Sequence, residues 1–453
     1  MACKDRALRR NDTVSATRAG RVNSWQGRPP GLPGAVPPPS VPLSFFAAAS
    51  AGLVACGVAW IWVRSTAVGD PTADPVVAAV HLAVLATLAM GIIGAMHQFT
   101  PVITGRPLYS IRLARLTFVT WLAASWLLPI GIATEQLAIT AISGVFAGVG
   151  IVLLVINLGI PLLVKGKGIA VVALRFALVG AVLTTCLGIT FVGDRQGHWF
   201  HLAGHIDLAM AIIGLFSWLG ITYIGVAEKL WSMFMLAHIS GAHRAGQLAV
   251  WATPPGAALL ATGLAWSISS LAYIGAFVLA IGLASHLVSL YDHMRQRRRK
   301  VDLHLIFVVT SAAWLIVGAG LAISAVLTLP DDTHRGEALA AAATAAFGGW
   351  LLEALVAHAH KVLPFILWSV LRARGVATGP GGKPLMFADL YHRRWAEVTY
   401  LTVTFGIAAL CLGLGASLPT AGALAGFLFV LTGIVITTNL SLPPIWLLAQ
   451  LAR

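Results

Sequence analysis

The stretch GAMHQFTP, residues 94–101, ends a long apolar segment and decides how the rest of the chain is divided. A related stretch, GVAEKLWS, occupies residues 225–232, and a third, AHAHKVLP, occupies residues 357–364. The intervals between their starting positions, 94, 225 and 357, are almost equal. This period is too long for a solenoid, and each period holds about four membrane-length apolar segments. The pattern therefore predicts three repeats of four helices each.

The composition indicates a polytopic membrane protein. Of the 453 residues, 58% are hydrophobic and only 10% are charged, whereas about a quarter of the residues of a soluble domain are charged. The net charge of +14 does not indicate nucleic-acid binding, because the Lys and Arg residues lie in short links between apolar runs, where they orient a membrane protein. The four cysteines show no CxxC or Cys–His spacing, so we interpret them as small apolar residues.

Twelve apolar segments are long enough to cross a bilayer, which takes about 20 residues. They are predicted near residues 41–64, 75–99, 111–133, 137–164, 168–192, 199–227, 247–267, 269–291, 303–328, 337–363, 396–417 and 421–448. Lys and Arg concentrate in every second link, so both termini are expected on the cytoplasmic side of a bacterial plasma membrane. The expected fold is an all-α membrane protein with three parallel repeats, at about residues 41–164, 168–291 and 303–448.

Two further patterns complete the expected organisation. Residues 1–40 are polar and basic and lack the apolar core and cleavage site of a signal peptide, so they are predicted to form a disordered cytoplasmic tail. A Gly–Asn–Pro pattern with the same spacing recurs in the fourth and twelfth spans. It comprises Gly144, Asn157 and Pro161, and then Gly426, Asn439 and Pro443.

Ionisable residues inside apolar spans are candidates for function, because inserting them into the bilayer is costly. An outer cluster is formed by His81 in the second span and by His201, His205 and Asp207 in the sixth. His201 and His205 are four residues apart and share one helix face, which suits two ligands of one metal, or one ligand and its hydrogen-bonding partner. Neutral imidazole also binds heme iron. The alternative is that these histidines bond water or lipid headgroups at the interface.

An inner cluster lies at the other end of the same spans. It contains His97, Glu228, His358, His360 and Lys361. His97, Glu228 and His360 take equivalent positions in the three predicted repeats, which favours a second cofactor site or a proton-handling group. The alternative is that they are ordinary helix ends, where His and Lys neutralise the helix dipole. Sixteen residues separate His81 from His97, or roughly 24 Å along a helix, so the outer and inner clusters would be two sites.

The remaining polar residues are more dispersed. Glu353 in the tenth span is a candidate for a proton path or for helix–helix packing. Arg175, His286 and Asn157 also lie within spans. Six histidines in links or at span boundaries are interpreted as solvated: His238, His243, His293, His304, His334 and His392.

Twelve spans, both termini inside, three parallel repeats and histidines on spans 2, 6 and 10 resemble subunit I of the heme–copper oxidases. The resemblance is closer to the C-type and nitric-oxide-reductase-like branches than to the mitochondrial type. At residue level it is carried by residues 81–101 with GRPL at 105–108, by residues 205–234, and by KVLPFILW at 361–368. The GRPL stretch is also similar to the NnrS family of heme- and copper-containing proteins.

The resemblance implies specific ligands. His81 matches an axial ligand of the family's low-spin heme, and His205 or His201 matches a copper ligand. His358 and His360 have the family's His-x-His spacing, in which two side chains about 200° apart serve two cofactors, but they lie at the inner end of the span. The paired histidines of span 7, the tyrosine after the span 6 histidine and the arginine pair before span 12 are absent, which argues against a terminal oxidase.

The function expected from the sequence is therefore a heme-binding membrane protein that transfers electrons or handles O2 or NO. Heme b is the expected cofactor, and copper is left open as a second one. The expected partners are membrane lipids, a cytochrome or quinol electron donor and small partner subunits, without nucleic acid. Two alternatives stay open: an active oxidase or nitric oxide reductase with unusual ligands, and a cofactor-free transporter or scaffold for metal or heme.

Overall fold

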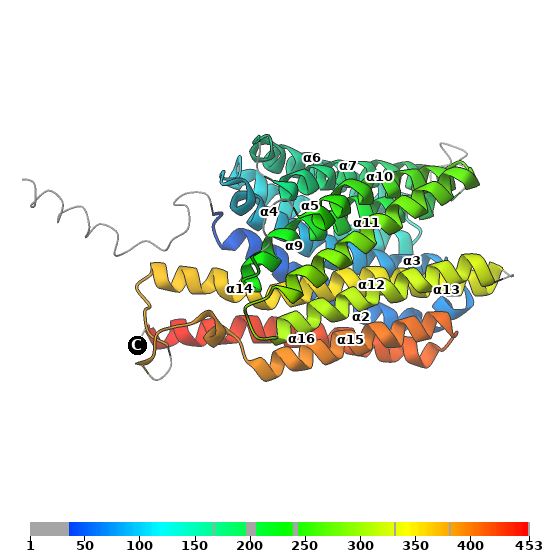
Figure 1. Ribbon diagram of the computed structural model, residues 1–453. Helices are drawn as coiled ribbons and strands as arrows, with labels where there is room; N and C mark the ends of the chain where they lie inside the picture. Colours follow the sequence, from blue (N-terminus) through cyan, green and yellow to red (C-terminus); the bar gives the residue numbers. More distant parts are fainter. Residues whose placement is uncertain are drawn as a thin grey trace, which may run out of the picture.

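The computed structural model describes residues 36–165, 168–195, 205–238, 243–329, 332–379 and 382–451. These residues form a helical bundle without a β-strand (Figure 1). Twelve of its helices are long and apolar enough to cross a membrane, which confirms the predicted number of spans. Most of the predicted tail, residues 1–35, lies outside the described residues.

Nine spans are single α-helices, and three are divided by a π-helical segment. The single helices are α2 (Ser40–Gly69), α5 (Ile111–Ala133), α6 (Leu137–Leu162), α7 (Ile169–Arg195), α10 (Arg244–Ala265), α11 (Ser269–Arg295), α12 (Leu303–Thr328), α15 (Arg393–Gly415) and α16 (Pro419–Leu451). The divided spans are α3 (Asp74–His81), η2 (Leu82–Ala89) and α4 (Met90–Thr104); α8 (Ile206–Ile212), η3 (Ile213–Gly220) and α9 (Ile221–Phe234); and α13 (Asp332–Thr344), η4 (Ala345–Leu352) and α14 (Glu353–Ala373).

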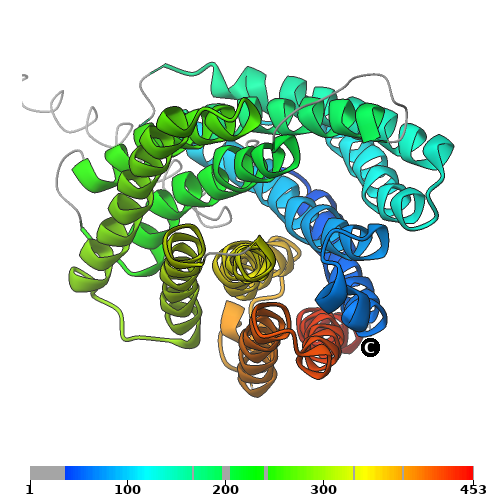
Figure 2. The same ribbon diagram turned by 90° about the vertical axis from the view of Figure 1, so that its right-hand side faces the viewer.

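The three divided spans form the centre of the bundle. In their most apolar windows 61%, 72% and 56% of the residues are buried, against 28–50% in the other nine spans. Their π-helical segments contact one another, since η4 touches both η2 and η3. In the end-on view of Figure 2 the remaining helices surround them. A residue on a divided span is therefore shielded from lipid more often than one on any other span.

The π-helical segments begin at Leu82, Ile213 and Ala345. The two intervals between these positions are identical to those between the three related sequence stretches, so each segment precedes its stretch by the same distance along the chain. A π-helix is rare and is found frequently at functional sites. The π-helical segments and the related stretches that follow them are therefore candidate functional regions.

Close backbone contacts hold the outer helices together. α16 packs along α2, so the last span lies against the first. At their crossing, a Cβ atom on either Gly57 or Gly426 would lie 2.5 Å from the carbonyl oxygen of the other. Gly275 of α11 meets the backbone of α10 at Leu260 just as tightly. Glycine is needed at these crossings because any side chain would separate the two helices.

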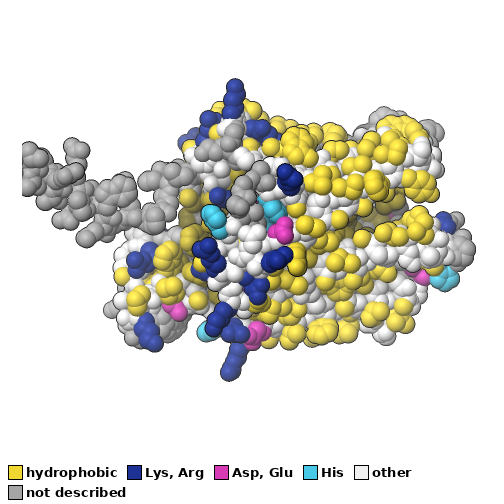
Figure 3. All heavy atoms as spheres, in the orientation of Figure 1, with side chains coloured by type: hydrophobic (Ala, Val, Ile, Leu, Met, Phe, Trp, Pro, Cys, Tyr) yellow, Lys and Arg dark blue, Asp and Glu magenta, His cyan; other side chains and the backbone are white. Residues whose placement is uncertain are grey.

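The charges are unevenly distributed along the bundle. The links between spans 2 and 3, 4 and 5, 6 and 7, 8 and 9, and 10 and 11 all lie at one end, which we call the basic end. Exposed Lys and Arg side chains gather there, including Arg106, Lys165, Arg244, Arg297 and Arg372. On the face drawn in Figure 3, most Lys and Arg side chains lie in the left half, whereas hydrophobic side chains predominate in the right half.

Candidate functional site

The inner cluster of the sequence lies at the basic end of the three central spans. His97 of α4 is fully buried, His360 of α14 is 5% exposed, and the side chain of Glu228 on α9 is 7% exposed. His97 Nδ1 lies 2.8 Å from the carbonyl oxygen of Ile93, and His360 Nδ1 lies 2.9 Å from that of Val356. A carbonyl oxygen only accepts, so both Nδ1 atoms carry the proton. Their Nε2 atoms are buried without a hydrogen-bond partner.

A second pair of buried histidines lies beside this layer. His358 donates its Nδ1 proton to the carbonyl oxygen of Ala354 at 2.7 Å, and its Nε2 atom has no hydrogen-bond partner. His304 of α12 is 5% exposed, and neither of its ring nitrogens has a partner. The two ring centroids are 4.9 Å apart. The prediction that His304 is solvated is therefore wrong.

The environments of His97 and His360 differ. His97 stacks on Phe45 of α2 with a centroid distance of 5.3 Å, whereas His360 stacks on Phe307 of α12 at 6.0 Å. Each imidazole is thus packed against a different outer helix. The two imidazoles therefore lie in different surroundings.

In the part that the structure describes, the residues of the outer cluster are more exposed than those of the inner cluster. His81 is half-buried, and its Nδ1 atom lies 2.7 Å from the carbonyl oxygen of Val77. His205 and Asp207 are exposed at the start of α8. His201 lies outside the described residues. The predicted roles of these residues in binding heme or copper remain predictions.

The candidates for a proton path have local partners. One oxygen of the buried Glu353 carboxylate accepts a hydrogen bond from Thr404 at 2.9 Å, and the other has no hydrogen-bond partner. Lys361 Nζ lies 2.5 Å from a carboxylate oxygen of Asp302, which caps the start of α12. Arg175, a further polar residue within a span, donates to the carbonyl oxygens of Leu162 and Val164 at the end of α6, so it caps that helix.

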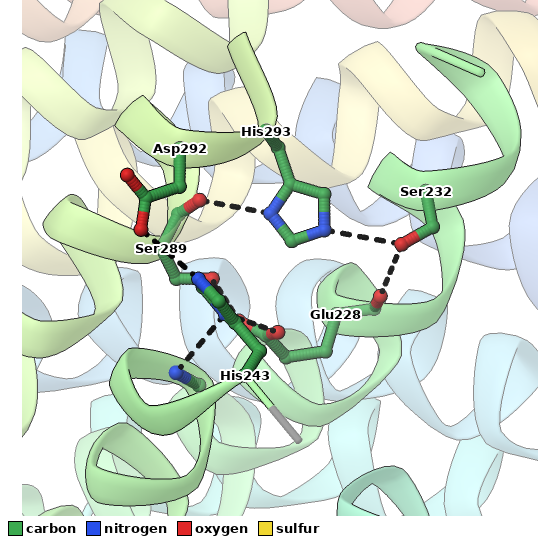
Figure 4. A network of polar contacts seen from close by, with 7 residues as sticks. Glu228, Ser232, His243, Ser289, Asp292 and His293 are labelled. Carbon is green, nitrogen blue, oxygen red and sulfur yellow. Dashed lines mark hydrogen bonds and ion pairs between the residues drawn. The ribbon is translucent and has the colours of Figure 1, made fainter. Parts of the chain in front are cut away.

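The densest polar arrangement surrounds Glu228 (Figure 4). Glu228 of α9, His243 at the N-cap of α10 and His293 of α11 each place one ligand atom within 4.8 Å of the others. His243 Nδ1 lies 3.5 Å from Glu228 Oε2. The hydroxyl of Ser289 donates to Glu228 and contacts His243 Nδ1 at 3.2 Å. We call Glu228, His243 and His293 the triad.

Both imidazoles of the triad are oriented by hydrogen bonds on their outer nitrogens. His293 donates from Nδ1 to the carbonyl oxygen of Ser289 at 2.8 Å, which leaves Nε2 as an acceptor, 3.1 Å from the hydroxyl of Ser232. His243 accepts from the backbone N–H of Gly246 at Nδ1 and contacts Asp292 through Nε2 at 3.1 Å. Its partners thus assign the proton to Nε2. His243 Nδ1 and His293 Nε2 are therefore acceptors, and the Glu228 carboxylate lies in the same cluster.

Sequence reasoning included Glu228 but missed the other two members. It treated His243 and His293 as solvated, whereas His293 is 1% exposed and the side chain of His243 is 18% exposed. The spacing of His286, Ser289 and His293 offers a signal, because residues at i, i+3 and i+7 share one helix face. Nothing in the sequence places His243 beside them.

Rings connect the triad with the His304–His358 pair. The ring centroid of His293 lies 5.6 Å from that of Trp231, which stacks on His286 at 5.1 Å. The ring centroids of His286 and Tyr223 are 5.5 Å apart, and those of Tyr223 and His358 are 5.8 Å apart. A continuous row of aromatic and imidazole rings therefore runs from the triad through the space between α9, α11, α12 and α14.

Spans 1–4, 5–8 and 9–12 form a first, second and third group. At the basic end of the first and third groups, an asparagine on the last helix bonds the start of the helix before it. The Asn157 side chain of α6 accepts the backbone N–H of Ser110 at 2.8 Å, and Asn439 of α16 accepts that of His392 at 2.7 Å. Both bonds join residues 47 positions apart, and Ser289 and His243 are 46 apart. We call the two asparagine contacts the asparagine links.

Neither a comparison with protein-family models nor a search of curated proteins gives a match for this sequence.

Proposed function

We propose that this protein is a heme-binding membrane protein that transfers electrons or handles O2 or NO, with copper as a second cofactor. The observation that carries the proposal is a set of buried imidazoles with unpartnered ring nitrogens at the basic end of the bundle. Its members are His97, His304, His358 and His360. An unpaired polar atom in an apolar interior is costly, and a metal ion bound to each lone pair would remove that cost.

The donor chemistry of these histidines suits metal ligation. His97, His358 and His360 each bond a backbone carbonyl through Nδ1, which fixes the ring and leaves Nε2 as the ligand atom. Histidines that bind metals typically have such an outer hydrogen bond. In this proposal His97 or His360 holds the heme iron from one side, and His304 and His358 hold copper. The bound heme would supply a redox-active iron with a coordination position open to a gas ligand.

The inner histidines support the proposal better than the predicted outer set does. His97 and His360 are almost completely buried, whereas His205 is exposed. Burial excludes water from a heme and is one of the means by which a protein sets its potential. His81 remains the outer candidate, because it has the same Nδ1 bond to a carbonyl oxygen.

The proposal includes an architecture and an orientation. We propose that the three groups of four spans are parallel repeats, since the related sequence stretches and the π-helical segments recur at the same two intervals along the chain. We also propose that the basic end faces the cytoplasm of a bacterium, because Lys and Arg are retained on that side of a membrane. The resemblance to subunit I of the heme–copper oxidases is consistent with both.

The test is an absorption spectrum with pyridine hemochrome and metal quantitation on detergent-purified protein. We expect one heme per chain, lost in His97→Ala or His360→Ala and retained in the control His238→Ala, whose exposed imidazole belongs to none of the clusters. Loss with His81→Ala alone would move the site to the outer cluster. Two hemes with an additional metal would favour an oxidase or nitric oxide reductase. A colourless protein would overturn the proposal and favour a transporter or scaffold.

A further inference from the structure

We propose that the triad of Glu228, His243 and His293 is a binding site for a divalent first-row transition metal such as Zn2+ or Fe2+. The site is separate from the proposed heme and copper ligands. It lies at the basic end of the second group of spans, where α9, α10 and α11 each contribute one ligand (Figure 4).

The first argument is the convergence of acceptors. One ligand atom of each residue lies within 4.8 Å of the other two, and His243 Nδ1 is 3.5 Å from Glu228 Oε2, which is close enough for one ion about 2 Å from each ligand after small side-chain rotations. None of these three atoms carries a proton in the arrangement that the hydrogen bonds define. His243 Nδ1 accepts from the Gly246 N–H and His293 Nε2 from the Ser232 hydroxyl, so both nitrogens are acceptors beside the Glu228 carboxylate. A cation between them would replace these hydrogen-bond partners and neutralise the negative charge.

The second argument is the support behind each ligand. His243 has the Asp292 carboxylate on its outer nitrogen, at 3.1 Å, and His293 has the backbone carbonyl of Ser289, at 2.8 Å. Carboxylates and backbone carbonyls are the usual partners of metal-binding histidines, because they fix the tautomer and raise the basicity of the ligand nitrogen. Both rings are thus held with the correct nitrogen inward, and the outer partners come from one helix, α11.

The donor set and the exposure define the class of metal. Two imidazole nitrogens and one carboxylate suit Zn2+, Fe2+ and similar ions, and they leave positions for water or a substrate. His293 is buried, whereas the side chains of His243 and Asp292 are 18% and 37% exposed. An ion can therefore enter from the basic end. The hydroxyls of Ser232 and Ser289 lie beside the ligands, at 3.1 Å from His293 Nε2 and 3.2 Å from His243 Nδ1.

The experiment is a Zn2+ titration of the full-length, detergent-purified, chelator-treated protein by calorimetry, with Co2+ absorption as a second probe. We expect one tight Zn2+ per chain. Glu228→Gln, His243→Ala and His293→Ala should each weaken binding at least 100-fold, and His238→Ala should bind as the wild type does. The titration needs no heme, so failure of the heme proposal leaves this result unaffected.

A fourth variant separates loss of the site from loss of the fold. A Cβ atom at Gly246 would press directly on the Glu228 carboxylate, so Gly246→Ala displaces one ligand while it keeps every donor atom. We expect Zn2+ binding about tenfold weaker, with unchanged elution on size exclusion. The proposal is overturned if the wild type binds no stoichiometric Zn2+, or if the three ligand variants bind it as tightly as the wild type.

Discussion

The basic ends of the first and second groups of spans join their third and fourth helices in different ways. In the first group a neutral amide, Asn157, accepts a backbone N–H from the start of α5. In the second group Ser289 and Asp292 of α11 reach His243 at the start of α10, and Glu228 and His293 complete the cluster. A single amide is sufficient to join two helices. The additional ionisable groups of the second group therefore point to ion binding rather than to helix packing.

The third group has an asparagine contact like that of the first, so the second group differs from both. Asn439 accepts the backbone N–H of His392 and also donates to its carbonyl oxygen at 3.2 Å. Two of the three groups thus contain an asparagine link and one contains the triad. If the comparison is correct, changes in the asparagine links should alter stability alone, and changes around the triad should alter metal binding.

The largest effect on stability is expected from loss of an asparagine link. Asn157→Leu and Asn439→Leu each leave a backbone N–H unpaired, which should lower the free energy of unfolding by about 1–3 kcal/mol. Denaturant unfolding in detergent measures the change. Thr438→Ala is the matched control, because its hydroxyl bonds only a carbonyl of its own helix. Equal stability of Asn439→Leu and Thr438→Ala would break the comparison.

Bound metal should stabilise the fold by a similar amount. At a free Zn2+ concentration 100 times its Kd, we expect the unfolding free energy to rise by about 2.7 kcal/mol, since the unfolded chain lacks the site. The rise should persist in Asn157→Leu and fall to about 0.4 kcal/mol or less in Glu228→Gln, whose Kd is expected to be at least 100-fold higher. Thermal unfolding with and without a chelator provides the measurement, and a rise of the same size in Glu228→Gln would refute the assignment.

Asp292 should act on the metal through His243. Asp292→Ala removes the partner of His243 Nε2 and should weaken Zn2+ binding by about 10–100-fold. Asp292→Asn keeps an acceptor at that position and should recover part of the affinity, which a purely structural role would not produce. The test is a competition titration with a chromophoric chelator. Wild-type affinity in Asp292→Ala would show that the contact plays no part in binding.

The smallest effect is expected from the ion pair between Lys361 and Asp302. Both side chains are partly exposed, and pairs of this kind contribute about 0–1 kcal/mol. Lys361→Met should therefore change stability little and leave Zn2+ binding unchanged. A decrease above about 2 kcal/mol, larger than any exposed pair provides, would mean that Lys361 has a role beyond this contact.

Hydropathy and periodicity predicted much of this molecule, but not the assembly of the triad. The twelve spans follow from apolar length alone, and the shared intervals predict that His97, Glu228 and His360 take equivalent positions in three repeats. His243 belongs to a link and His293 to the end of a span, where histidines are normally solvated. They meet only because α10 and α11 pack closely together. The packing of α10 against α11 is a tertiary contact, and no local sequence pattern predicts it.

The π-helical segments determine where a central span can lose one residue. A π-helical turn holds one residue more than an α-helical turn, so removing one residue from η2 lets the span close as an α-helix, with α3 and α4 keeping their relative faces. The same deletion within α4 would rotate the residues beyond it by about 100° and turn His97 away from Phe45. Each central span thus contains an equivalent π-helical segment from which a single residue can be removed without reorienting the buried end of the span.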